Sequence, residues 1–213
     1  MFGKLKGTGL VLLAILSIEV ASAADISANI DFNSEYIYRG LPQRTSSAFG
    51  GLDIEAGGFY LGTWAADVGD GAEIDYYGGY GFEAGEFGFS IGGTLYTYTG
   101  GFDDQYLEIN LGASWKWLSL DMASGEYDNF VGPKLDYRFY SLTVSHSGFY
   151  GKYGTFEEDF DGRYFEAGYG GSFSLDDKDL FDYSLTVIYS DSTLLGGESD
   201  TRFVLTLSRA FDF

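Results

Sequence analysis

The amino-acid sequence predicts an all-β fold, a transmembrane antiparallel up-and-down β-barrel of about 12 strands that follows a cleaved signal peptide. Three observations support this prediction: an export signal at the N-terminus, apolar and polar residues that alternate along most of the chain, and a final amphipathic strand that ends on an aromatic residue. Alternation with a period of two separates apolar from polar side chains on the two faces of a strand.

Residues 1–23 have the features of a secretory signal peptide. Lys4 and Lys6 precede a short apolar run at 10–16, and Ala21-Ser22-Ala23 matches a small-residue cleavage site. The apolar run is shorter than the ~20 residues that a transmembrane helix needs. We therefore expect residues 24–213 to form one barrel domain in the cell outer membrane.

The first strand sets the pattern for the others, because Ile26, Ala28 and Ile30 alternate with polar neighbours. Gly57-Gly58 has the composition of a tight turn between the second and third strands. Similar alternation predicts strands at about 25–39, 47–56, 59–67, 73–82, 87–98, 105–115, 117–124, 130–138, 139–146, 163–175, 180–190 and 202–213.

The predicted connections alternate between long and short, which is typical of outer-membrane barrels with long external loops and short periplasmic turns. A soluble barrel with its apolar face inward is the alternative, but about 12 strands enclose more space than the ~8 whose side chains fill a barrel. The predicted long loops are 40–46, 68–72, 99–104, 125–129, 147–162 and 191–200.

The terminal strand carries Phe203, Leu205, Leu207, Phe211 and Phe213 on one face. A last strand that ends in Phe resembles the C-terminal strand of bacterial outer-membrane barrels. This resemblance implies that the barrel-insertion machinery recognises it and that it pairs with the first strand.

Composition excludes several classes of protein. The sequence contains 18 Tyr, 19 Phe and 32 Gly but only 2 Pro, a composition that suits a sheet with aromatic belts and tight turns. A net charge of −20 argues against a nucleic-acid partner, and the absence of Cys excludes a disulfide scaffold or a thiolate metal site.

His146 lies between Ser145 and Ser147, whose side chains point to the opposite face, so no Ser–His pair is formed within the strand. We predict no catalytic, cofactor-binding or metal-binding residue.

Four motifs in the first half of the chain resemble, in this order, those of the TorF-like porin family. They are Y-R-G-L-P-Q at 38–43, G-F-Y-L-G-T-W at 58–64, E-I-D-Y-Y-G-G-Y at 73–80 and Y-T-Y-T-G at 96–100. The sequence departs from the family pattern at Pro42, where Ser is usual, and at Thr99, where Pro is usual. The resemblance implies an outer-membrane barrel and says little about the solute.

If the apolar faces meet outer-membrane lipid and lipopolysaccharide, the polar faces line the lumen. Carboxylates outnumber bases there, which predicts a cation-preferring pore for passive diffusion of small hydrophilic solutes. The alternative is a lumen plugged by salt bridges and Tyr side chains, in a structural or surface-recognition barrel that acts through 40–46, 147–162 and 191–200. The predicted lumen residues are Asp31, Glu35, Arg39, Asp53, Glu55, Glu73, Asp75, Glu108, Asp121, Lys134, Asp136, Arg138, Glu166 and Arg202.

Overall fold

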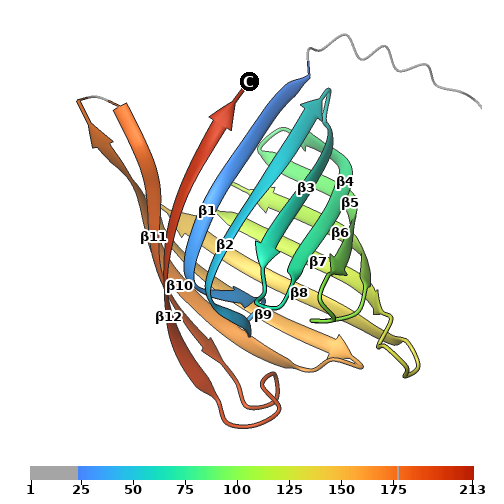
Figure 1. The fold of residues 1–213 in the computed structure, drawn as a ribbon. Helices are drawn as coiled ribbons and strands as arrows, with labels where there is room; N and C mark the ends of the chain where they lie inside the picture. Colours follow the sequence, from blue (N-terminus) through green and yellow to red (C-terminus); the bar gives the residue numbers. More distant parts are fainter. Residues whose placement is uncertain (1–23, 177) are drawn as a thin grey trace, which may run out of the picture.

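The structure, a computed structural model, describes residues 24–176 and 178–213, so the predicted signal peptide lies outside the described residues. This part of the chain forms a barrel of antiparallel strands (Figure 1). No helix within it is long and apolar enough to cross a membrane. The strands are β1 (Asp25–Tyr38), β2 (Leu41–Ala56), β3 (Phe59–Asp67), β4 (Ala72–Ala84), β5 (Phe87–Tyr98), β6 (Tyr106–Trp115), β7 (Leu118–Tyr127), β8 (Leu135–His146), β9 (Phe149–Glu158), β10 (Gly162–Leu175), β11 (Lys178–Ser190) and β12 (Asp200–Asp212).

Each strand pairs with its neighbours in sequence, and β12 pairs with β1 to close the sheet. This closed, antiparallel barrel of 12 strands confirms the predicted fold class. Closure leaves no free edge along most of the wall, as a sheet in a lipid environment requires. The outward side chains are largely apolar and exposed, among them Ile30, Leu61, Ile109, Leu185 and Phe203.

The two ends of the barrel differ in their connections. One end, the turn end, carries two-residue turns such as Gly57-Gly58 and Ser147-Gly148, together with the start of β1 and the C-terminus (Figure 1). The other, the loop end, carries most of the longer connections, at 68–71, 99–105, 128–134, 159–161 and 191–199. The predicted asymmetry is therefore present, with one exception: only Arg39-Gly40 separates β1 from β2.

The prediction was wrong between residues 130 and 162. The predicted strands 130–138 and 139–146 form the single strand β8, which begins after the loop 128–134, and most of the predicted long loop 147–162 is β9. Ser147 and Gly148, with φ of 51° and 83°, make the turn between them. The physical reason is that Tyr137 and Phe139 point into the barrel and are buried there. The prediction places the aromatic residues of this segment on the lipid face, and it therefore divides one strand into two.

Candidate functional site in the barrel lumen

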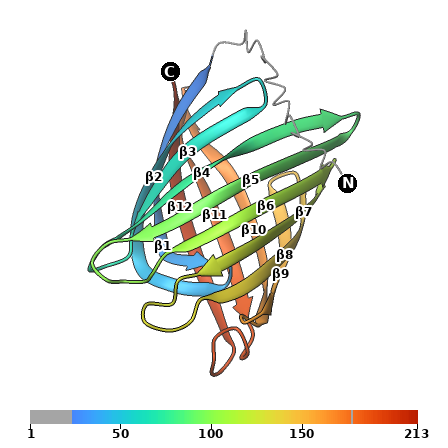
Figure 2. The same cartoon turned by 90° about the vertical axis from the view of Figure 1, so that its right-hand side faces the viewer.

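Residues 34–48, named here the inward hairpin, leave the barrel wall. Pairing of β1 with β12 stops at Asn33 and Thr206, and pairing of β2 with β3 starts only at Phe49 and Ala66. Between these points the two strands pair only with each other, with a register shift between Tyr36 and Ile37. The end of β1, drawn in blue, turns across the barrel interior (Figures 1 and 2). The predicted external loop 40–46 is thus part of a hairpin inside the lumen.

The hairpin ends in a tight turn at Arg39 and Gly40, with φ of 48° and 82°. Two positive φ values in a two-residue hairpin are usually supplied by Asn or Gly, and Arg is an uncommon choice. Gly40 is required here, because a Cβ at this position would lie 2.7 Å from Cβ of Tyr164. The geometry of the turn therefore does not explain why Arg occupies position 39. A residue in such a strained position is expected to serve through the contacts of its side chain.

The guanidinium of Arg39 forms a bidentate ion pair with Glu108 on β6. Nη1 donates to Oε1 at 2.5 Å and Nη2 donates to Oε2 at 3.0 Å. The two side chains are 14% and 0% exposed, so the pair is shielded from water. The guanidinium carbon also lies 4.2 Å from the ring centroid of Phe139 and 4.9 Å from that of Tyr38. We name the set of Glu108, Phe139 and Tyr38 the arginine cage.

Further hydrogen bonds fix the carboxylate of the cage. Tyr137 OH donates to Oε1 of Glu108 at 2.7 Å, and Tyr96 OH and Asn110 Nδ2 donate to Oε2 at 3.0 Å and 2.9 Å. Tyr38 OH donates to Tyr96 OH at 2.8 Å. Every lone pair of the buried carboxylate therefore faces a donor, which is the condition under which a buried charge is tolerated.

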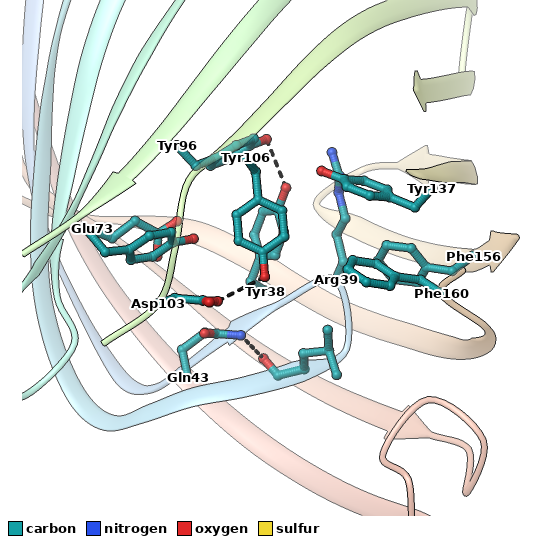
Figure 3. Close-up of a pocket in the computed structure, with 12 residues that line it drawn as sticks. Tyr38, Arg39, Gln43, Glu73, Tyr96, Asp103, Tyr106, Tyr137, Phe156 and Phe160 are labelled. Atoms are coloured by element: carbon teal, nitrogen blue, oxygen red, sulfur yellow. Dashed lines mark hydrogen bonds between the residues drawn. The ribbon is translucent and has the colours of Figure 1, made fainter. Parts of the chain in front are cut away.

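Arg39 lies between two cavities of the lumen. The first, of about 50 Å³, is lined mainly by aromatic side chains and by Glu73 and Asp103, and Figure 3 shows Arg39 among the tyrosines that surround it. The second, of about 250 Å³, is lined by polar side chains that include Ser90 and Asp121. Arg39 lines both, so the tip of the inward hairpin lies where the two spaces approach each other.

Two acidic side chains of β4 are buried in the lumen without a basic partner. Glu73 is 1% exposed and accepts a hydrogen bond of 3.0 Å from Tyr36 OH on the inward hairpin. Asp75 is 7% exposed, and its Oδ1 has no hydrogen-bond partner. Neither carboxylate takes part in an ion pair within the described residues.

Most of the predicted lumen residues do lie on the inner face of the strands. The register and the side-chain contacts place Asp31, Glu35, Arg39, Asp53, Glu55, Glu73, Asp75, Glu108, Asp121, Glu166 and Arg202 there. Arg202 Nη1 donates to Glu35 at 2.6 Å, so one of these bases is paired with one of the acids. Whether these residues line a conducting pore remains a prediction.

Three predicted lumen residues lie elsewhere. Asp136 and Arg138 alternate along β8 with the buried Tyr137 and Phe139, so both are on the outer face, and Arg138 pairs with Glu158 at 2.9 Å. The error follows from the assumption that aromatic residues of this strand meet lipid.

The third, Lys134, lies in the loop 128–134 at the loop end of the barrel. Its ammonium group pairs with Asp128 at 2.8 Å and with Glu126. Hydrogen bonds to these two carboxylates raise the pKa of Lys134 above its usual range. Its charge is therefore held at the rim and not in the lumen.

Sequence reasoning missed Lys152 and the inward aromatics of β8 and β9. Lys152 shares a face of β9 with the buried Phe156 and lines the second cavity. The alternation of residues 149–156 could have revealed this strand. Nothing in the local pattern shows that Tyr38 turns inward, because this depends on where the β1–β12 pairing ends.

The closed sheet, the apolar exterior and the polar lumen define the class of porin-like outer-membrane β-barrels. The KdgM porin has this fold at 11% identity with a TM-score of 0.54, and the match covers 88% of this chain and 99% of that one. A protein solved in a study of the in-meso crystallization of membrane proteins matches at 9% identity and a TM-score of 0.60, over 89% of this chain and 84% of that one. At these identities the likeness concerns the fold.

Within that class, the chain belongs to a bacterial protein family of unknown function, Gcw_chp, whose family model matches residues 17–147. This match includes the inward hairpin and Glu108. No curated protein matches the sequence.

Proposed function

We propose that this protein is an outer-membrane channel for passive diffusion of small hydrophilic solutes, with a preference for cations, in which the inward hairpin is the gate. The porin-like fold and the resemblance to the TorF-like family fit this proposal. Outer-membrane lipid and lipopolysaccharide would surround the wall, and the terminal strand would be read by the insertion machinery.

The observation that carries the proposal is a vacancy in the wall that matches the inward hairpin. Residues 200–205 of β12 pair with β11 but, among the residues that the structure describes, have no strand partner on their other side. If the β1–β12 register continued beyond Asn33 and Thr206, Tyr38 would lie opposite Thr201 and Arg39 opposite Asp200. The hairpin can therefore re-enter the wall and pair with β12 without a change in the β1–β12 register.

The residues of the hairpin suit both positions. In the wall, Tyr36 and Tyr38 would lie on the outward face, where Tyr is favoured near a membrane interface, and Glu35 would lie on the inward face. In the lumen, the same tyrosines donate hydrogen bonds to Glu73 and Tyr96. A sequence that satisfies two packings is what a two-state element requires.

Polar and aromatic contacts hold the hairpin in the lumen. Besides the Arg39–Glu108 pair and the hydrogen bonds of Tyr36 and Tyr38, Ser190 Oγ donates to the carbonyl oxygen of Gly40 at 2.6 Å. An unpaired strand edge on β12 opposes this state, because free backbone groups are costly in lipid. We propose that the two positions are close enough in free energy to interconvert.

The cation preference rests on the charge of the lumen. Carboxylates beside open space in the lumen attract cations and repel anions; Asp121 at the second cavity is one of these, and it has no ion-pair partner within the described residues. Replacing Asp121 by Asn would remove one such charge with little change in volume. The reversal potential should then move toward that of an unselective pore.

The direct test is conductance of the refolded mature chain in a planar bilayer under a KCl gradient. The proposal expects discrete steps, a cation-selective reversal potential, and lower selectivity in the Asp121→Asn variant. A folded, inserted protein that passes no current under any applied voltage would contradict it.

That outcome would favour the second candidate function, a closed structural or surface-recognition barrel. The buried layer formed by Tyr137, Phe139, Phe156 and Tyr164 in the lumen is the observation that supports this alternative.

A further inference from the structure

We propose that the arginine cage is a binding site for the guanidinium group of a small solute, and that Arg39 occupies it as a tethered stand-in for that solute. The inference rests on the proposed function, because the solute enters the cage when the inward hairpin leaves it. It goes further in naming a chemical class of ligand and the groups that recognise it.

The geometry of the cage selects a guanidinium over other cations. A flat fork of N–H groups meets both oxygens of Glu108, at 2.5 Å and 3.0 Å, and this bidentate fit is specific to a planar guanidinium. The face of Phe139, 4.2 Å from the guanidinium carbon, accepts a flat cation by stacking in either position of the hairpin, whereas Tyr38, at 4.9 Å, adds a second face only while the hairpin is inside. An ammonium group offers neither the fork nor the flat surface.

Part of the cage is fixed independently of the inward hairpin. Glu108 on β6 is held by Tyr96 on β5, Tyr137 on β8 and Asn110 on β6, all of which belong to the wall. Phe139 is on β8. When the hairpin moves, the site loses Tyr38 and Arg39 but keeps its carboxylate, the donors that orient it and one ring face.

The approach from the loop end suits a cation. The smaller cavity, which ends at Arg39, is lined by Glu73 and Asp103 as well as by tyrosines (Figure 3). Asp103 accepts hydrogen bonds from Tyr106 at 2.9 Å and from Tyr127 at 2.7 Å, which hold its carboxylate in place. A positively charged solute would therefore meet the oriented carboxylate of Asp103 before it reaches Glu108.

Competition between the solute and Arg39 links binding to opening. A ligand that binds only when the hairpin is in the wall shifts the equilibrium toward that state by mass action. The positive φ of Arg39, at 48°, is consistent with a residue placed at the turn for its side chain. A guanidinium solute would thus both open the channel and bind inside its lumen.

The test is chemical complementation of the Arg39→Ala variant by methylguanidinium. In the refolded chain in detergent, millimolar methylguanidinium should raise the unfolding temperature of this variant more than it does for the wild type. Methylammonium at the same concentration should bind at least about tenfold more weakly, because it lacks the bidentate contact. The Arg39→Ala/Glu108→Gln double variant should lose the response, whereas Arg138→Ala, which removes an exposed rim arginine, should behave as the wild type.

Equal stabilisation by the two cations, or an undiminished response in the double variant, would overturn the inference. If Arg39→Ala does not fold, the test moves to Arg39→Lys, which keeps a charge but cannot form the fork, with the same expected order of ligands. Binding in detergent is measured without conductance. A cage that binds methylguanidinium in a protein that never conducts would therefore contradict the proposed function and leave the site intact.

Discussion

Replacing Glu108 by Gln should open the channel, because it removes the charge that holds Arg39 in the lumen. The change keeps the volume of the side chain and one carbonyl acceptor, so Tyr96 or Tyr137 retains a partner. What it removes is the second acceptor of the bidentate pair and the negative charge. The Arg39 guanidinium, in a side chain that is 14% exposed, is then left without a counter-ion.

The size of the expected change in free energy between the closed and open states follows from the burial of the Arg39–Glu108 pair. Removing one partner of a buried ion pair costs ~3–5 kcal/mol, and the remaining amide acceptor places this case near the lower end. The cost falls on the state with the hairpin inside, because Arg39 would be solvated at the rim when the hairpin is in the wall. A loss of ~3 kcal/mol changes the ratio of open to closed states about 100-fold.

The assay is the open fraction of single channels, recorded for the wild type and for Glu108→Gln under the same voltage and salt. The matched control is Glu158→Gln, which disrupts the partly exposed pair with Arg138 at 2.9 Å. Such surface pairs contribute ~0–1 kcal/mol, so this variant should differ little from the wild type. An open fraction of Glu108→Gln equal to that of the control, in a protein that is folded and inserted, would refute the reasoning.

Two further variants probe the tip of the hairpin. Gly40→Val should raise the open fraction by at least about tenfold, because its backbone has φ of 82° and a Cβ would lie 2.7 Å from Cβ of Tyr164; an unchanged open fraction in single-channel records would show that the tip is not tightly seated. Ser190→Ala removes the hydrogen bond to the Gly40 carbonyl and should raise the open fraction about fivefold, the equivalent of ~1 kcal/mol, while a lower open fraction would contradict this assignment.

The fold class could be predicted from the sequence because a β-barrel in a membrane depends on a local rule. Alternating residues face lipid and lumen, and this period can be counted along β1, β5, β6 and β12 without knowledge of the rest of the chain. The rule failed at β8 because it assumes that aromatic residues are outside. Here rings such as Tyr137 fill part of the lumen, so the inner face of β8 carries aromatic residues as well.

The candidate site was predictable only in part. Arg39 and Glu108 were both expected in the lumen from their parity, yet nothing in the sequence indicates that they form a pair. Their contact requires the inward hairpin to leave the wall, and this depends on the relative lengths of the β1–β12 and β2–β3 pairings. Such lengths are a property of the closed barrel and have no local signal.

Movement of the inward hairpin into the wall is tested most directly by a disulfide between Tyr38→Cys and Thr201→Cys. The chain has no Cys, so a crosslink can come only from the introduced pair. Tyr38 contacts Tyr96 on β5 in the structure, and it would face Thr201 only in the wall. The matched control, Phe32→Cys with Leu207→Cys, joins residues already opposite each other in the same β1–β12 register. The account predicts that both pairs crosslink under a membrane-permeant oxidant and that the Tyr38–Thr201 variant conducts more once crosslinked. If the control pair crosslinks and the Tyr38–Thr201 pair never does, the proposed movement of the inward hairpin into the wall is contradicted.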